Sequence, residues 1–398
     1  MKANRVTGDL GGRRVMVVFG TRPEAIKLAP IVHSLEASGD FRPMVTVTAQ
    51  HRGMLDQVLE LFQITPEHDL DVLRDRQTLA GITVRAMDGL NRVIAAERPE
   101  AVIVQGDTTT TFVGALAAFY NKVPVVHVEA GLRTFDPLSP YPEEVNRRLT
   151  TQLTSLHLAP TAISRDNLLR EGVAPTAVIV TGNSVIDALL WSVGRDDVTV
   201  GAAVAEVVSD PRRMLLVTAH RRESWGEPMA SVGRGLRRLA TGRPDLLVVL
   251  PAHANPVVRE TILPLVEDLP NVVVMEPQPY GEFSRLLDRS DIVLTDSGGV
   301  QEEAPSLGKP VLVMRDTTER PEAVEAGTAR LVGTDEDVIV RTVSRLLDDP
   351  AEYAAMANAV NPYGDGEAAR RTVESLRHFF GVGESPDEFV PVPAVAGS

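Results

Sequence analysis

The sequence contains no cysteine. Disulfide bonds, thiolate nucleophiles and zinc sites built on cysteine are therefore excluded. Long apolar runs are missing as well, and a stretch such as residues 246–250 is far too short to span a bilayer. Residues 1–14 show no apolar segment of the kind that a secretory signal needs. We therefore expect a cytoplasmic protein with no membrane partner.

Positive charge is in deficit, because 40 Lys and Arg residues stand against 54 Asp and Glu residues and leave a formal net charge of -14. An excess of negative charge disfavours nonspecific attraction to nucleic acid or to anionic lipid. We therefore expect no nucleic-acid partner. Any anionic ligand has to meet a local cluster of basic side chains.

Sequence patterns that bind metals or cofactors are absent or misplaced. There is no Walker A sequence and no H-E-x-x-H, and the eight histidines show no ligand spacing. Residues 364–369 fit the letters of the dinucleotide fingerprint G-x-G-x-x-A, but they follow the turn-like residues 361–363 rather than a strand. We therefore expect no metal and no added cofactor.

Hydrophobic residues make up 43% and charged residues 24% of the 398 residues, which is the balance of a soluble globular protein. This length, without a fixed-period repeat, favours two domains. Short Val- and Ile-rich runs alternate with longer helical patterns, which predicts an α/β protein with parallel sheets covered by helices on both faces. The expected strands are 15–19, 45–48, 101–105, 125–128, 214–218, 246–250, 272–275, 292–295 and 311–314.

The predicted architecture is two Rossmann-like domains with a deep cleft between them. A boundary is expected near 181–183, where a strand-like run ends in Gly and Asn and a new helical pattern begins. The first domain then comprises 1–181 and 367–398, and the second comprises 182–366. The helical segment 367–380 is expected to cross back onto the first domain, and the chain from Gly381 onward is expected to fray. The short linker predicts hinge motion.

Open parallel sheets bind ligands beyond the C-terminal ends of their strands, so the residues that follow each strand are candidates. Arg22 and Lys27 follow the first strand, near the start of a helix whose first turn holds Pro23. Two cations at this place suit an anionic ligand. The competing interpretation is that both are ordinary exposed cations.

Two acids follow the next strands of the first half. Asp107 comes after 101–105 and precedes a run of threonines, so it is either a helix N-cap or a catalytic acid. Glu129 ends the apolar run 125–128. Burial at such a position raises a carboxyl pKa and suits the group to proton transfer.

A third acid, Glu143, starts a helix soon after Glu129. The alternative here is a purely structural pair of i,i+4 ion pairs, Glu143 with Arg147 and Glu144 with Arg148. We favour a site residue, because the flanking loop residues can line the same cleft.

In the second half, His220 follows the strand 214–218 and precedes Arg221 and Arg222. Such a basic cluster suits a phosphate group. A lone histidine is usually structural, but one beside two arginines after a strand is a candidate for function.

The strongest phosphate signal is the turn 297–299, a Ser-Gly-Gly sequence between a strand and a helix. Backbone N–H groups and the helix dipole can bind a diphosphate there. Glu303 lies about one turn into the helix, where it can accept hydrogen bonds from ribose hydroxyls or simply complement the dipole. Arg320, just before Pro321, adds a cation at another helix start.

Together these segments closely resemble the non-hydrolysing UDP-N-acetylglucosamine 2-epimerase family, whose fold is of the glycosyltransferase-B type. The resemblance runs from about residue 15 to 379. The stretches that carry it are FGTRPEAIK, VTAQHR, GDTTTT, HVEAGLRT, SPYPEE, AHRRES, TDSGGVQEEAPSLGKP, RDTTERPEA and NPYGDG.

The resemblance implies a role for particular residues. Contacts to UDP are implied for Arg22, Gln278, Phe283, Ser297, Gly298, Gly299, Glu303 and Arg320. The residues implied around the reacting sugar and its diphosphate are Lys27, Asp107, Glu129, Glu143, Arg147 and His220. Many bacterial members bind a second, activating UDP-sugar, at positions that match Gln50, Arg76, Arg221 and His253. Gly53 stands where some members carry Gln. A homodimer is implied too.

The implied reaction inverts C2 of a UDP-N-acetylhexosamine. That C2 proton is not acidic, because C2 carries no carbonyl group, so direct deprotonation faces a large barrier. Expelling UDP from C1 while a base removes the C2 proton gives 2-acetamidoglucal, and the return of UDP with a proton on the opposite face inverts C2. Asp107, Glu129 and Glu143 are the acid/base candidates, and which is acid and which is base stays open.

Three other activities are weighed against epimerisation. A hydrolysing relative would release UDP and N-acetylmannosamine, a glycosyltransferase would need an acceptor, and a UDP-sugar sensor would need no acids. The presence of all the candidate carboxylates disfavours the sensor. The substrate is UDP-N-acetylglucosamine or a modified UDP-hexosamine, and the product would supply cell-surface polysaccharide or related glycoconjugates.

Overall fold

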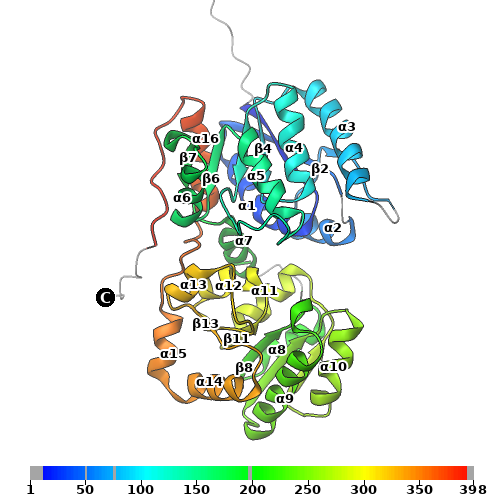
Figure 1. Ribbon diagram of the computed structural model, residues 1–398, viewed down its shortest axis with the longest axis vertical. Coiled ribbons are helices and arrows are strands. Elements are labelled where there is room, and N and C mark those ends of the chain that lie inside the picture. The colour runs from blue at the N-terminus through cyan, green and yellow to red at the C-terminus, as the bar shows by residue number, and fades with distance from the viewer. Residues whose placement is uncertain (1–11, 50–51, 75–77, 196–199, 392–398) are drawn as a thin grey trace, which may run out of the picture. The chain divides into compact units, whose positions relative to one another are not determined.

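The computed structural model describes residues 12–49, 52–74, 78–195 and 200–391 (Figure 1). The chain divides into two compact units, each built on a parallel sheet with helices on both faces. The first unit runs to Ala188 and includes Gly366–Phe389, and the second comprises Leu189–Asp365. The change of unit falls inside α7 (Ser184–Val193), just after the predicted boundary at 181/182.

The sheet of the first unit has the strand order β3-β2-β1-β4-β5-β6-β7, and all the neighbours are parallel. The sequence order reverses between β1 and β4, which is where parallel sheets of this type bind ligands. The strands are β1 (Arg13–Phe19), β2 (Phe41–Val47), β3 (His68–Asp69), β4 (Ala101–Gln105), β5 (Val125–Val128), β6 (Leu156–Ala159) and β7 (Val178–Val180). The four strands predicted in this half are confirmed.

Three helices of the first unit begin at threonine caps. Thr78, Thr108 and Thr161 each accept a hydrogen bond from a backbone N–H in the first turn of α3, α4 and α6. Such a cap stabilises a helix by about 1 kcal/mol. The helices are α1 (Arg22–Ser38), α2 (Arg52–Leu61), α3 (Leu79–Glu97), α4 (Thr109–Tyr120), α5 (Glu143–Leu153), α6 (Ala162–Arg170), the 3-10 turn η1 (Pro175–Ala177) and α16 (Ala368–Phe379).

The sheet of the second unit has the order β10-β9-β8-β11-β12-β13, again with parallel neighbours. Its strands are β8 (Arg213–Thr218), β9 (Leu246–Pro251), β10 (Val272–Met275), β11 (Ile292–Thr295), β12 (Val311–Val313) and β13 (Ala329–Leu331). Every strand predicted in this half is present, and β13 was not predicted. The helical elements are α8 (Ala202–Ser209), η2 (Arg222–Ser224), α9 (Glu227–Gly242), α10 (Pro256–Val266), α11 (Tyr280–Arg289), α12 (Gly298–Glu303), η3 (Ala304–Leu307), α13 (Pro321–Glu325), α14 (Glu336–Asp348) and α15 (Pro350–Ala357).

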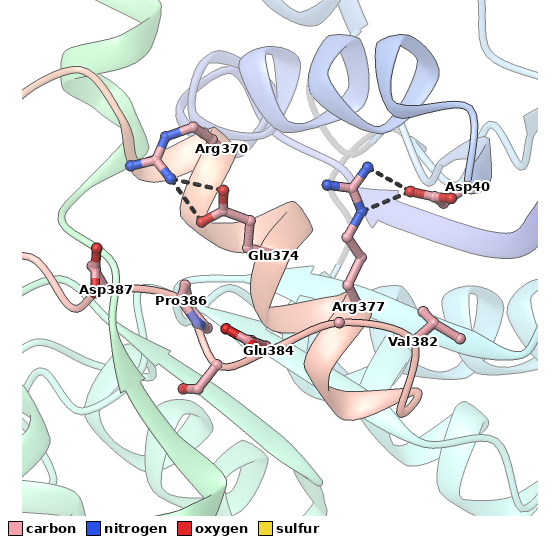
Figure 2. Close-up of a pocket in the computed structure, with 10 residues that line it drawn as sticks. Asp40, Arg370, Glu374, Arg377, Val382, Glu384, Pro386 and Asp387 are labelled. Atoms are coloured by element: carbon pink, nitrogen blue, oxygen red, sulfur yellow. Dashed lines mark hydrogen bonds and ion pairs between the residues drawn. The ribbon is translucent and has the colours of Figure 1, made fainter.

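The C-terminal helix α16 packs on α1 of the first unit. Arg377 forms an ion pair with Asp40 at 2.5 Å, in the turn between α1 and β2 (Figure 2). A cavity of about 580 Å³ lies between α16 and residues 382–387, and none of the predicted site residues lines it. Its arginines are already paired with acids, since Arg370 contacts Glu374 at 2.7 Å.

Beyond α16, Glu388 and Phe389 contact the first unit. The N–H of Phe389 donates to the carbonyl of Val180 at 2.8 Å, and the ring of Phe389 is buried. Glu388 accepts a hydrogen bond from the N–H of Val180 at 3.1 Å. The prediction that the chain frays from Gly381 is therefore wrong for Glu388 and Phe389, because both residues contact Val180 of β7. Within the described ranges, no helix combines the length and the apolar character needed to cross a bilayer.

Candidate active site

Glu129 lies at the C-terminal end of β5 in the first unit, in a buried position with a backbone φ of 62°. Its Oε1 accepts hydrogen bonds from Lys27 Nζ at 2.5 Å and from Asn183 Nδ2 at 3.1 Å. Its Oε2 accepts a hydrogen bond from Gln105. Donors from α1, β4 and the turn before α7 therefore hold this carboxylate in one place, and Lys27 is not a free surface cation.

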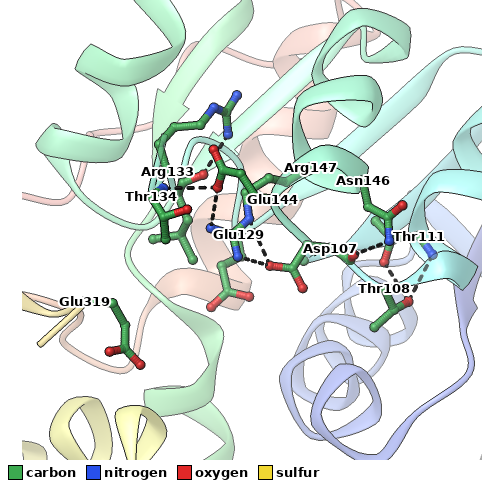
Figure 3. Close-up of polar contacts among 12 residues, drawn as sticks. Asp107, Thr108, Thr111, Glu129, Arg133, Thr134, Glu144, Asn146, Arg147 and Glu319 are labelled. Carbon is green, nitrogen blue, oxygen red and sulfur yellow. Dashed lines mark hydrogen bonds and ion pairs between the residues drawn. The ribbon is translucent and has the colours of Figure 1, made fainter. Parts of the chain in front are cut away.

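Asp107 follows β4, the strand next to β5, and its carboxylate is held by Arg147 of α5 (Figure 3). Oδ2 of Asp107 accepts hydrogen bonds from Nη2 of Arg147 at 2.5 Å and from Nε at 3.1 Å. Asn146 donates to the backbone carbonyl of Asp107 at 2.9 Å. Burial raises the pKa of Asp107, and the neighbouring Arg147 offsets part of that increase.

The purely structural roles considered for Asp107 and Glu143 are both wrong. Thr108, not Asp107, caps α4, because its side chain accepts from the N–H of Thr111. The i,i+4 ion pairs proposed for α5 do not form either. Arg147 contacts Asp107 and, at 3.2 Å, Glu144, while Arg148 lies 3.8 Å from Glu171.

The two glutamates at the start of α5 differ in environment. Glu144 is fully buried and accepts hydrogen bonds from the backbone N–H groups of Thr134 at 3.0 Å and Phe135 at 3.2 Å (Figure 3). Its carboxylate therefore fixes the loop before the helix. Glu143 is the first residue of α5 and is half-buried. Arg22, at the start of α1, is exposed.

Glu24 was not predicted as a site residue, yet it connects the two turns that precede α1 and α4. Its Oε1 accepts hydrogen bonds from the hydroxyls of Thr108 at 2.7 Å and Thr111 at 3.1 Å. Its Oε2 accepts from the N–H groups of Gly20 at 3.1 Å and Thr21 at 2.8 Å. Burial raises the pKa of Glu24, although these hydrogen bonds lower it. The pattern Thr-x-x-Glu, a capping-box signature, was the signal in the sequence.

In the second unit, Asp296 follows β11 and holds the turn that carries His220. Oδ2 of Asp296 accepts hydrogen bonds from the N–H groups of His220 at 2.7 Å and Arg221 at 2.8 Å. Nδ1 of His220 lies 2.8 Å from Oδ1 of Asp296. Burial raises the pKa of Asp296, but the contacts with His220 and with the two backbone N–H groups lower it more, so the net shift is downward. His220 is thus oriented by a buried acid.

The residues expected to bind a second UDP-sugar are only partly described. The His253 ring stacks on the His220 ring with centroids 5.9 Å apart. Arg221 forms an ion pair with Glu319 at 2.7 Å. Gln50 and Arg76 lie outside the described residues.

The turn at Gly298 lies close to the carboxylate of Glu319. A Cβ atom on Gly298 would lie 2.9 Å from Oε1 of Glu319. Gly299 is the next residue of α12, and Ser297 precedes the helix as its N-cap.

The other residues expected to contact UDP also follow strands of the second sheet. Glu303 ends α12 and accepts a hydrogen bond from the Tyr280 hydroxyl at 2.8 Å. Arg320 precedes α13 and is paired with Glu302. Gln278 and Phe283 are half-buried, Gln278 between β10 and α11 and Phe283 within α11. Within the part of the chain that the structure describes, His, Asp and Glu side chains do not gather in groups of three that could hold a metal ion.

The model of the UDP-N-acetylglucosamine 2-epimerase family matches residues 33–377. The chain belongs to this family. It is 53% identical over 372 residues to the UDP-N-acetylglucosamine 2-epimerase of Escherichia coli K12, which covers 92% of this chain and 98% of that protein. It is 52% identical over 377 residues to the Bacillus subtilis 168 enzyme of the same name, covering 94% and 98%.

A solved structure, that of the Neisseria meningitidis UDP-GlcNAc 2-epimerase bound to UDP-GlcNAc, superposes with a TM-score of 0.82 at 48% identity. It covers 92% of this chain and 100% of that one. The family resemblance predicted from the motifs is therefore confirmed. The protein is an enzyme of this epimerase family, and its two parallel-sheet α/β units have a fold of the glycosyltransferase-B type.

Proposed function

We propose that the protein interconverts UDP-N-acetylglucosamine and UDP-N-acetylmannosamine by eliminating UDP and adding it back. The observation that carries this proposal is the pair of acids at the ends of neighbouring strands. Asp107 after β4 is held by Arg147, and Glu129 after β5 is held by Lys27. Two positioned carboxylates, each with its own cation, suit the removal and the delivery of a proton.

In the elimination, a carboxylate takes the proton from C2 and the C–H electron pair forms the C1=C2 double bond. The bond from C1 to the diphosphate oxygen breaks, and UDP leaves with its electron pair. In the return step, a protonated acid donates to C2 from the opposite face while the diphosphate oxygen attacks C1. Atoms and charge balance, and no oxidant takes part. Asp107, Glu129 and Glu143 are the proposed acids and bases.

The second unit is proposed to bind UDP. Cations and backbone N–H groups there would stabilise the charge that develops on the leaving diphosphate. His220 is proposed to take part in this stabilisation, because Asp296 orients its ring. The proposed contacts to UDP are Arg22 from the first unit and Gln278, Phe283, Ser297, Gly298, Gly299, Glu303 and Arg320 from the second.

Incubation with UDP-N-acetylglucosamine in heavy water tests the chemistry. The product and the recovered substrate are expected to carry deuterium at C2. Product without deuterium at C2 would contradict the elimination. Asp107→Asn is expected to lower kcat strongly while UDP binding, measured by calorimetry, stays close to that of the wild type; wild-type kcat in this variant would remove Asp107 from the mechanism.

The same assay separates the other activities. Accumulation of free UDP together with N-acetylmannosamine would identify a hydrolysing enzyme. Epimerisation in the absence of any acceptor would exclude an obligate glycosyltransferase. A comparison of UDP-N-acetylglucosamine with modified UDP-hexosamines identifies the preferred substrate.

An activating UDP-N-acetylglucosamine is also proposed, at Gln50, Arg76, Arg221 and His253. The stacking of His253 on His220 supports it, because a ligand on His253 would act directly on a proposed site residue. A sigmoidal dependence of rate on substrate that becomes hyperbolic in His253→Ala would support this site. A homodimer in the cytoplasm that supplies polysaccharide synthesis completes the proposal, and sedimentation of the purified protein tests the dimer.

A further inference from the structure

Asn183 lies in the turn between β7 and α7, and its buried side chain makes two different hydrogen bonds. Oδ1 accepts from the N–H of Val185 at 3.1 Å, in the first turn of α7. Nδ2 donates to Oε1 of Glu129 at 3.1 Å. One short side chain therefore connects the start of α7 to a proposed acid/base group.

The start of α7 is also tied to the segment that returns from the second unit. The chain leaves the first unit along α7 and re-enters it at Gly366. Asp187, one turn further along α7, accepts hydrogen bonds from the N–H groups of Ala368 at 3.3 Å and Ala369 at 2.8 Å, at the beginning of α16. Arg371 of α16 donates to the carbonyl of Thr181 at 3.3 Å. The outgoing and returning segments are thus joined beside Asn183.

Two of the donors to Glu129, Lys27 and Asn183, differ in stiffness. Lys27 has a long side chain with high rotamer entropy, so it supplies charge more than it supplies direction. Asn183 has two rotatable side-chain bonds, and its Oδ1 is already fixed by the cap on α7. Because its amide plane is held at one end, its Nδ2 can define where Oε1 of Glu129 lies.

We propose that Asn183 is a positioning residue for Glu129 and couples its carboxylate to the segments that connect the two units. This inference rests on the proposed role of Glu129 in proton transfer. Asn183 acts through Glu129 and does not itself exchange a proton.

Asn183→Ser separates the two hydrogen bonds. Serine caps a helix about as well as asparagine does, so the bond to Val185 has a replacement, but its side chain is too short to reach Glu129. We expect kcat to fall by about 100-fold, the effect of a misplaced reacting group. KM is expected to change by less than about threefold, because binding does not depend on the direction of this carboxylate. The melting temperature is expected to stay within a few degrees of the wild-type value.

Asp335→Ser is the matched control for a changed cap. Asp335 caps α14 in the second unit through a 2.9 Å bond from the N–H of Val338, and it contacts no proposed site residue. Its kcat is expected to equal that of the wild type. A kcat loss in Asn183→Ser that is accompanied by a large fall in melting temperature, and that Asp335→Ser reproduces, would overturn the proposal in favour of a general folding defect.

A double-mutant cycle with Glu129→Gln shows whether Asn183 acts through Glu129. The slow residual exchange of the C2 proton in Glu129→Gln is expected to change by less than about threefold when Asn183→Ser is added. A further drop as large as that in the wild-type background would overturn the proposal. If Glu129→Gln has a strongly lowered kcat and Asn183→Ser has wild-type kcat, only the role of Asn183 fails. If Glu129→Gln keeps wild-type kcat, the proposed function of Glu129 itself fails.

Discussion

Glu24→Ala is expected to lower the free energy of unfolding of the first unit by about 3 kcal/mol. Glu24 is 1% exposed and accepts hydrogen bonds from the N–H groups of Gly20 and Thr21. Alanine offers no acceptor to either group, and each buried N–H left unpaired costs about 1–3 kcal/mol. We place the total loss toward the lower end of the range for two unpaired N–H groups, because removing a buried carboxylate also removes the cost of burying it.

The threonine hydroxyls that donate to Glu24 are expected to contribute less to this loss. Thr111 has an alternative acceptor, since its Oγ1 lies 2.6 Å from the carbonyl of Gln105. Glu24→Gln keeps the shape of the side chain and one acceptor oxygen for the backbone N–H groups. This variant is therefore expected to lose only about 1 kcal/mol.

Urea unfolding followed by two signals measures the effect. Far-UV circular dichroism reports both units. Tryptophan fluorescence reports the second unit, because Trp191 and Trp225, the two tryptophans of the chain, both lie there. With an m-value of about 2–3 kcal/mol/M, the midpoint of the circular dichroism transition of Glu24→Ala is expected about 1 M below the wild-type midpoint. A midpoint equal to that of the wild type, or equal losses in Glu24→Ala and Glu24→Gln, would refute the reasoning.

Three further predictions follow from single positions. Gly131→Ala is expected to lower the free energy of unfolding by about 3 kcal/mol, because its Cβ would lie 2.1 Å from the Ser164 carbonyl oxygen. Gly172 has a similar φ but open space around it, so Gly172→Ala should lower this free energy by about 1 kcal/mol. Equal losses of the two variants in urea unfolding would contradict this. Burial lowers the pKa of His157 from 6.5 to about 3, so its stabilisation is present above pH 6.5 and is lost as the pH falls toward 3. His157→Leu should flatten the fall in unfolding free energy over that window, and an unchanged slope would show that other groups cause it. Asp296→Asn should lower kcat about 100-fold, because it removes the carboxylate that orients His220. Calorimetry should show a UDP affinity close to that of the wild type. An unaltered kcat would show that the contact between Asp296 and His220 is structural only.

The strands found from sequence are those whose short runs are rich in Val and Ile. Val125–Val128 and Ile292–Thr295 are examples, and both have the predicted bounds. The strand β6 was not predicted, because its run Leu156–Ala159 contains none of the β-branched residues that mark the predicted strands. Its strand conformation depends on pairing with β5 on one side and β7 on the other, which no local pattern reveals.

The position of the two acids proposed for the site could be predicted for a similar local reason, because Asp107 and Glu129 each follow an apolar run. The partner of Asp107 could not be predicted from its neighbours in sequence. Local helix rules pair Arg147 with Glu143, but the structure pairs it with Asp107, 40 residues earlier in the chain. Asn183 and Gln105 were missed as well, since neutral amides near strand ends carry no charge pattern that marks them.

What the sequence determined by itself was the α/β class, most of the strands, the acids at the strand ends and the family to which the chain belongs. These properties depend on neighbours within a few residues, or on motifs that are continuous in the chain. Only the tertiary structure decided which donors hold each carboxylate, that Glu24 joins two turns, and that Asn183 ties Glu129 to α7. Parallel strands bring residues from distant parts of the chain to one edge of the sheet, so the partners of a site residue are set by the packing of whole elements and not by its neighbours in sequence.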